Sequence, residues 1–236
     1  MSGPEAASAV PEVKLRLYSG PLSMFGAKAQ IALGEKALPF DLVMVPFDMD
    51  RLYEPKHPDV LRVNPKRQVP VLIHGAVEIF DSTQIFEYLE ELAPKPALWP
   101  EARDDRARAR LLELQSDEVY FPHIMRLMSL QGSPDDPAAV AARAGAESFY
   151  LRMEKQLNGA DYLAGAYSYA DIALFMALVF GDRMGAPIGE SHSNLIAWRT
   201  RVSLRPAVRQ VVEPMARYLL TQGGRVPLWL NMSQPM

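Results

Sequence analysis

The first third of the chain alternates short strand-like runs with one helical stretch. Residues 13–18 alternate apolar and basic side chains, which predicts a half-buried strand. Apolar residues recur at helical spacing over residues 23–36, and a second strand-like run covers residues 40–45. Residues 46–63 hold several prolines and charges, which predicts a loop with at most a short helix. Two strands joined through a helix should lie parallel, with a right-handed crossover.

Two further strands are predicted directly after this loop. The apolar runs at residues 70–73 and 76–80 flank a short connection that contains Gly75, which is typical of a hairpin. Asp81 and Ser82 then open a helix with one apolar face. This order, strand–helix–strand followed by strand–strand–helix, predicts an α/β unit.

The rest of the chain has a helical pattern. Three prolines in residues 93–100 indicate a linker between domains. The helices predicted beyond it cover residues 103–130, 137–158, 169–184, 191–202 and 206–221. We therefore expect an all-α helix bundle as the second domain. The expected division is an α/β domain at 13–93, a helical domain at 101–222, a disordered leader at 1–12 and a tail at 223–236.

Composition excludes several classes of function. The 236 residues carry a net charge of -3, so the overall balance does not favour nucleic acid as a partner. The absence of cysteine excludes thiolate metal sites, a cysteine nucleophile and a thiol–disulfide oxidoreductase, so any thiol must come from a bound molecule. No apolar stretch approaches the roughly 18 residues of a membrane span, and the first twelve residues lack a signal peptide's features. We expect a cytoplasmic protein without a membrane partner or a metal site.

The first candidate for chemistry is a hydroxyl at the start of a helix. Ser23 stands just past the first strand, where backbone N–H groups and the helix dipole favour negative charge. The alternative is that Ser23 only caps the helix.

A second candidate is the turn that runs from Asn64 to Leu72. Pro70 directly before a strand allows a cis peptide bond and a backbone edge at Val69 that could receive an extended peptide. The alternative is a proline that simply starts an edge strand.

The third candidate is the pair Asp81 and Ser82. A serine at a helix start can hold a carboxylate, and an aspartate beside it could pair with an ammonium group, as an amino-acid head requires. A plain helix cap is again the alternative. A fourth motif, Ser168 to Asp171, fits a capping box and is given a structural role only.

Taken together, these motifs resemble the cytosolic glutathione transferases of the serine type, which include the theta, phi and zeta classes. The resemblance runs from about Val13 to about Leu220 and rests on the order of the motifs: Leu-Tyr-x-x-x-x-Ser, Asn-Pro-x-x-Gln-Val-Pro-Val-Leu, Asp-Ser before Ile-x-x-Tyr-Leu, and the Ser-x-x-Asp box. It implies a thioredoxin-like N-terminal domain, a helical C-terminal domain, glutathione as co-substrate and a homodimer.

The resemblance also implies roles for individual residues. Ser23 is similar to the hydroxyl that hydrogen-bonds the glutathione sulfur. The implied remaining ligands are Lys56 for the glycyl carboxylate, Gln68 nearby, Val69 with cis Pro70 for the cysteinyl backbone, and Asp81 with Ser82 for the γ-glutamyl head.

The sequence departs from the family pattern at two positions and leaves two alternatives open. Met24 stands where many serine-type members have proline, and Arg67 replaces a common glycine, where it would either narrow the pocket or add a cation. Tyr18 is a rival donor to the sulfur, because some classes use tyrosine near this point, and Ser19 is less favoured by spacing.

These residues imply a transferase that activates the thiol of glutathione for attack on a small apolar electrophile. We expect the electrophile pocket to use Tyr120, Phe121, Met125 and Met128, although residues at helical spacing also fit a core. The alternative function is a non-catalytic binding or scaffold protein that uses its apolar cleft or the tail with Trp229, which could fold over the cleft, pack on the bundle or dock a partner.

Overall fold

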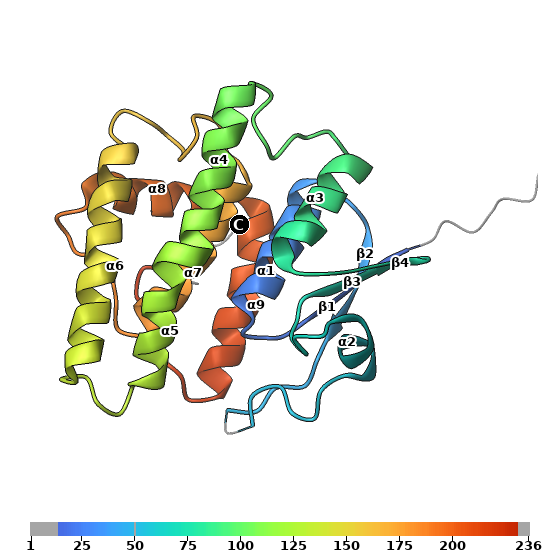
Figure 1. Cartoon of the computed structure of the whole chain (residues 1–236), viewed down its shortest axis with the longest axis horizontal. Coiled ribbons are helices and arrows are strands. Elements are labelled where there is room, and N and C mark those ends of the chain that lie inside the picture. Colours follow the sequence, from blue (N-terminus) through green and yellow to red (C-terminus); the bar gives the residue numbers. More distant parts are fainter. Residues whose placement is uncertain (1–13, 50, 231–236) are drawn as a thin grey trace, which may run out of the picture.

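The computed structural model describes residues 14–49 and 51–230, which form an α/β unit and a helical unit packed against each other (Figure 1). The strands of the first unit are β1 (Leu15–Ser19), β2 (Phe40–Met44), β3 (Val71–His74) and β4 (Val77–Phe80). Its helices are α1 (Met24–Glu35), α2 (Pro58–Val63) and α3 (Ser82–Leu92). The predicted thioredoxin-like α/β fold followed by an all-helical bundle is confirmed.

The sheet has the order β2-β1-β3-β4. β1 and β2 are parallel and joined through α1, as predicted, while β3 is antiparallel to both β1 and β4. The hairpin between β3 and β4 turns at Gly75, whose φ of 62° is easily reached only without a Cβ atom. Successive residues of β1 point to opposite faces, so that Leu17 joins the main core beneath α1 and Tyr18 joins a smaller core on the other face, with Val60 of α2.

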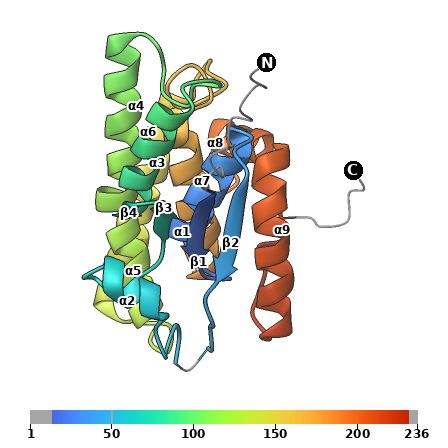
Figure 2. The same cartoon turned by 90° about the vertical axis from the view of Figure 1, so that its right-hand side faces the viewer.

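The helical unit begins at α4 (Arg103–Gln115) and continues through α5 (Phe121–Ser129) and α6 (Pro137–Gln156). It ends with α7 (Tyr169–Arg183), α8 (Ser193–Ser203) and α9 (Pro206–Thr221). Nearly every side chain of α7 is buried, as expected of a central helix that is apolar all round. α1 packs against both α7 and α9, and this contact joins the two units (Figures 1 and 2).

The single helix predicted for residues 103–130 is interrupted. A π-helical turn, η1 (Ser116–Tyr120), separates α4 from α5. Pro122 lacks the N–H that would bond the carbonyl four residues back, and its ring crowds that carbonyl, so the backbone widens there and Phe121 N–H donates to Ser116 O five residues back. The turn changes which residues of this segment face the sheet unit.

The predicted capping box at the start of α7 is confirmed. The Asp171 carboxylate accepts from the Ser168 backbone N–H at 2.8 Å and also from the Leu163 N–H and the Trp198 indole. Burial raises the pKa of Asp171, and these donors oppose that effect. Its role is to hold the centre of the bundle.

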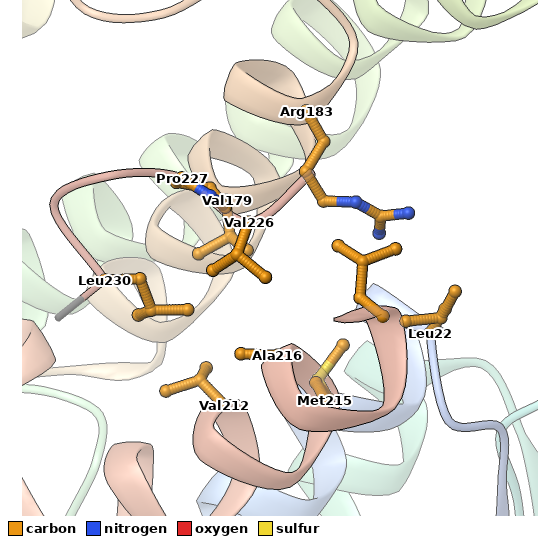
Figure 3. A pocket seen from close by; sticks show the side chains of 10 residues that line it. Leu22, Val179, Arg183, Val212, Met215, Ala216, Val226, Pro227 and Leu230 are labelled. Atoms are coloured by element: carbon orange, nitrogen blue, oxygen red, sulfur yellow. The ribbon is translucent and has the colours of Figure 1, made fainter. Parts of the chain in front are cut away.

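The C-terminal tail packs on the bundle as far as residue 230. Trp229 Nε1 donates to Asp182 at 2.9 Å, and the Arg199 guanidinium lies 4.3 Å from the centroid of the indole ring. Val226, Pro227 and Leu230 close over α7 and α9, with the Arg183 side chain beside them (Figure 3). The cavity left beneath has a volume of about 20 Å³, enough for a water molecule only. Residues 231–236, like the predicted leader, lie outside the described residues.

Candidate functional site

Ser23 caps α1 and keeps a proton to donate. Its Oγ accepts from the Gly26 N–H at 3.0 Å, which is the ordinary N-cap bond. That bond uses a lone pair of the hydroxyl oxygen, and the hydroxyl proton makes no hydrogen bond to any described residue. The side chain is partly exposed. The structure therefore contains the cap, and the cap leaves the hydroxyl proton free for an acceptor from outside.

The two rival hydroxyls are already engaged. Tyr18 is buried and donates to Asp59 Oδ2 at 2.6 Å. Burial and this hydrogen bond raise the pKa of Tyr18. Ser19 is completely buried and accepts from the Gln30 side chain at 2.8 Å. Of the three candidates, Ser23 is the one with both exposure and an unused proton.

The turn before β3 is held together by Asn64. Its side chain donates to Gln68 O at 2.6 Å and accepts from the Lys66 N–H at 2.9 Å. The Val69–Pro70 peptide bond is cis, as the family resemblance implied. Arg67 has a φ of 58°, a left-handed conformation that glycine adopts without a steric penalty, which explains why glycine is common there.

The start of α3 carries the other pair of predicted ligands. Asp81 is the N-cap, with its Oδ1 accepting from the Thr83 and Gln84 N–H groups at 3.0 and 3.4 Å. Its φ of 76° is rare for a residue with a side chain, and such strain is often found at binding sites. Ser82 follows as the first residue of the helix and is 3% exposed.

These two segments meet in one pocket of about 220 Å³. Gln68, Val69 and Pro70 from the turn line it together with Asp81 and Ser82 from α3. Five of the predicted glutathione ligands, from two separate stretches of sequence, thus share one pocket. Ser23 does not line it directly.

Lys56, the residue expected at the glycyl carboxylate, lies outside this pocket. Its ammonium group lies 3.4 Å from Glu54 and is absent from the pocket wall, whereas Lys66 lines the pocket. The contact of Lys56 with the glycyl carboxylate therefore stays a prediction. Lys66 is held beside the pocket by the turn after Asn64, whose side chain accepts from the Lys66 N–H. Arg67 is exposed and does not line the pocket either.

An apolar hollow of about 430 Å³ adjoins this pocket. Phe121 lines both spaces, and Met125 lines the hollow with Pro122, Arg126 and Ser129. Met128 is exposed on the same helix but does not line the hollow.

The expectation that Tyr120 lines the electrophile pocket is wrong, because its side chain points into the helical core. It is completely buried, and its hydroxyl bonds the Tyr150 hydroxyl at 2.7 Å. A Cβ atom at position 181 would lie 2.0 Å from that hydroxyl, so Gly181 makes the space for it. Burial raises the pKa of Tyr120 well above its usual value.

Comparison with known proteins agrees with this geometry in both units. The N-terminal domain family of glutathione S-transferases matches residues 17–97, and the C-terminal domain family matches residues 112–206. The chain belongs to the glutathione S-transferase family.

The relatives that the chain matches in sequence have been given different names. The chain is 28% identical to glutathione S-transferase F10 of Arabidopsis thaliana, over 84% of this chain and 95% of the relative. It is 27% identical to FtsZ-localized protein A of Caulobacter vibrioides, over 85% of this chain and 91% of the relative. It spans about half of a stringent starvation protein A homolog of Coxiella burnetii (32% identity, 51% of this chain, 54% of the relative).

Among solved structures, a glutathione S-transferase from Rhodospirillum rubrum is similar with a TM-score of 0.76. The two chains are 27% identical, and the match covers 92% of this chain and 98% of the other. The similarity extends over both units, so the arrangement of the sheet unit against the bundle is that of the family.

In this glutathione S-transferase family member, the pocket also uses residues that the sequence motifs did not mark. These are Phe25, Lys66, Phe80, Asp117 and Glu118, and the lining also includes Asn64 of the second motif and Phe121, which was expected in the electrophile pocket. Asp117 and Glu118 belong to η1, and the only sequence signal for this turn is Pro122, two residues after its end. One signal was available for a neighbour of the pocket: Lys28 is a lone charge in the apolar run of α1, which indicates a buried ion pair.

Among the residues described, no helix is long and apolar enough to cross a bilayer.

Proposed function

We propose that this chain is a glutathione transferase in which Ser23 donates a hydrogen bond to the sulfur of bound glutathione. The observation that carries the proposal is the shared pocket of Gln68, Val69, Pro70, Asp81 and Ser82. It offers an extended backbone edge and a helix start within one space, and these suit a short peptide that ends in an amino-acid head.

The proposed chemistry is thiol activation. A free thiol has a pKa of about 8.5, so only a few per cent is thiolate at neutral pH. A hydrogen bond to a charged group contributes about 1.5–3 kcal/mol, which corresponds to about one to two units of pKa. The start of α1 adds the positive end of the helix dipole. Ser23 thus stabilises the thiolate and forms no covalent intermediate.

The electrophile would lie in the apolar hollow beside Phe121 and Met125. Phe121 packs against Phe25 with ring centroids 5.2 Å apart and against Phe180 at 5.7 Å. This aromatic wall borders both the pocket and the hollow, so an apolar molecule there would lie next to the peptide site. Exposed methionine beside aromatic rings suits substrates of varied shape.

Steady-state kinetics on Ser23→Ala and Ser23→Thr test the proposal. Alanine removes both the donor and the cap, whereas threonine keeps both. We expect Ser23→Ala to lower kcat/KM for a generic aryl halide by roughly tenfold to hundredfold. Ser23→Thr should retain most of the activity. Equal activity in Ser23→Ala and the unmodified protein would overturn the mechanism.

We also propose a homodimer, in keeping with the family. Leu111 and Leu114 of α4 are 53% and 52% exposed, and Val119 of η1 and Val77 of β4 are about 40% exposed. Helices α3 and α4 lie side by side on one side of the molecule (Figure 2). A second copy covering this face would bury these apolar side chains. Light scattering should give a dimer mass that Leu111→Glu with Leu114→Glu converts to a monomer mass.

A binding role without turnover is the second candidate. It is supported by the relative named FtsZ-localized protein A. The tail offers it little support, since Trp229 is engaged with Asp182 and Arg199. Deletion of residues 224–236 distinguishes the two roles. If the shortened chain no longer bound a protein partner but kept its affinity for glutathione, the binding role would be favoured.

A further inference from the structure

The apolar hollow beside the glutathione pocket contains one charged side chain. Its wall is formed by residues of α5, namely Phe121, Pro122, Met125, Arg126 and Ser129. The Ser129 hydroxyl donates to the Arg126 backbone oxygen at 2.8 Å, so it is engaged within the helix. In the part of the chain that the structure describes, the exposed Arg126 guanidinium makes no hydrogen bond or ion pair. It is therefore available to an anion from outside.

A second cation lies behind the same aromatic wall. Arg183 is in the last turn of α7, and its guanidinium lies 5.5 Å from the centroid of the Phe180 ring. That ring packs against Phe121, with centroids 5.7 Å apart. None of the described carboxylates pairs with Arg183, and burial lowers the pKa of its side chain. The Gln131 side chain donates to Met184 O at 3.0 Å, which joins this end of α7 to the end of α5. Two arginines without an acid partner thus make the electrostatic potential more positive at this wall.

The acids of this region lie toward the glutathione pocket. Asp117 and Glu118 line that pocket and do not line the hollow. Asp117 is paired with the Lys28 ammonium group at 2.6 Å, whereas Glu118 is exposed and makes no ion pair with a described residue. Bound glutathione would bring its thiolate to the same side. An anionic group on the electrophile would therefore be repelled from the pocket and attracted to the far end of the hollow.

The spacing along α5 sets where this anionic group would lie. Phe121 borders both spaces, so the carbon that reacts with the glutathione sulfur would lie near its ring. Arg126 is five residues further on, which corresponds to about 7.5 Å along the helix axis. Met125 lines the hollow as well and offers an apolar surface to the body of the molecule. The arrangement suits an electrophile whose reacting carbon and anionic group are at opposite ends.

We propose that the electrophile of this chain is an apolar molecule with a carboxylate remote from its reacting carbon, and that Arg126 binds this carboxylate. The inference rests on the proposed glutathione site and names the substrate class of that site. A guanidinium group can donate two parallel hydrogen bonds to one carboxylate. The carboxylate itself does not react. With an aryl chloride, the thiolate sulfur forms a C–S bond to the ring carbon, and chloride leaves with the electron pair of the C–Cl bond.

Two glutathione conjugates that differ in one charge test the proposal by binding. They are the conjugates of para-chloro-meta-nitrobenzoate and of its neutral amide, both with the sulfur opposite the carboxylate or carboxamide. The variants are Arg126→Gln and Arg126→Lys. The control is Arg152→Gln, which removes the same charge from an exposed position of α6 outside the pocket and the hollow. Affinities are measured by calorimetry on the full chain after unfolding curves establish that each variant is folded.

The expected result is a preference for the charged conjugate that depends on Arg126. The unmodified protein and Arg152→Gln should bind the carboxylate conjugate roughly fivefold to tenfold more tightly than the carboxamide. Arg126→Gln should bring this ratio close to one by weakening the carboxylate conjugate alone, and Arg126→Lys should keep part of it. Because the contact is exposed, added salt should reduce the preference of the unmodified protein. An unchanged ratio in Arg126→Gln, or equal affinities in the unmodified protein, overturns the inference.

Steady-state kinetics with the two parent aryl chlorides separate this inference from the proposed function. The Arg126 contact would be remote from the reacting carbon, so Arg126→Gln should raise KM for the benzoate roughly fivefold to tenfold and leave kcat unchanged. An equal loss of kcat/KM for both chlorides would indicate a structural role and overturn the inference. Turnover of both without a preference overturns the inference and leaves the proposed function intact. Binding with the charge preference but without turnover overturns the transferase activity and supports the role of Arg126. Failure to bind either conjugate overturns both.

Discussion

The buried cation in α1 gives the sharpest prediction about stability. Lys28 is completely buried, and its partners Glu113 and Asp117 have side chains that are 6% and 16% exposed. Lys28→Met would keep much of the apolar volume and leave two carboxylates without their cation. Breaking a buried pair from one side typically costs about 3–5 kcal/mol, and we expect a loss of free energy of unfolding in this range.

The loss of free energy of unfolding in Lys28→Met should depend on pH. Burial raises the pKa of Glu113, while Lys28 lowers it. Without Lys28 the pKa of Glu113 would rise further, so the folded state would take up a proton more readily than the unfolded state. An acid with a raised pKa when folded destabilises the protein increasingly as pH rises above its unfolded value of about 4.3. The loss should therefore be smaller at pH 5 than at pH 8.

Denaturation in urea at both pH values measures this loss. Circular dichroism and tryptophan fluorescence should be followed together, because coincident curves are needed for a single free energy. A loss of about 3–5 kcal/mol corresponds to a fall in Tm of roughly 6–20 °C for a chain of this size. Adding Glu113→Gln to Lys28→Met should recover part of the stability. A loss below about 1 kcal/mol at pH 8 would refute the reasoning.

Three further predictions concern other parts of the molecule. Gly181→Ala should lower the free energy of unfolding by about 1–3 kcal/mol, and adding Tyr120→Phe should restore most of it, since the new Cβ atom would lie 2.0 Å from the Tyr120 hydroxyl. Trp229→Ala should lower that free energy by about 1–3 kcal/mol and leave glutathione affinity unchanged, because the tail does not line the pocket. The Tyr18 hydroxyl holds the pKa of Asp59 below its usual value. Tyr18→Phe should therefore cost about 1 kcal/mol above pH 4, and this difference should vanish as pH falls through the pKa of Asp59.

The elements of the fold could be predicted because each has a local cause. Strand alternation, the hairpin at Gly75 and the cap at Asp81 are all visible within a few residues of sequence. The α-helical break at η1 was not predicted, since a helical pattern continues through it. Only Pro122, which removes one backbone donor, indicated the break.

The site was predictable where a motif is continuous and unpredictable where contacts cross between units. The turn at Val69 and Pro70 and the start of α3 came from short motifs, and they share a pocket. Asp117 is 89 residues away from Lys28, and nothing local relates the two. Tyr120 was misjudged because a helical pattern does not say which aromatic side chain faces the core.

The central claim is that Ser23 stabilises the thiolate of bound glutathione. Its most direct test is a pH titration of the ultraviolet absorbance of the thiolate, with glutathione bound to the unmodified protein and to Ser23→Ala. The account predicts a bound thiol pKa about one to two units below the free value of about 8.5, and a return toward that value in Ser23→Ala. An equally low pKa in Ser23→Ala, or a pKa near 8.5 in the unmodified protein, would contradict it.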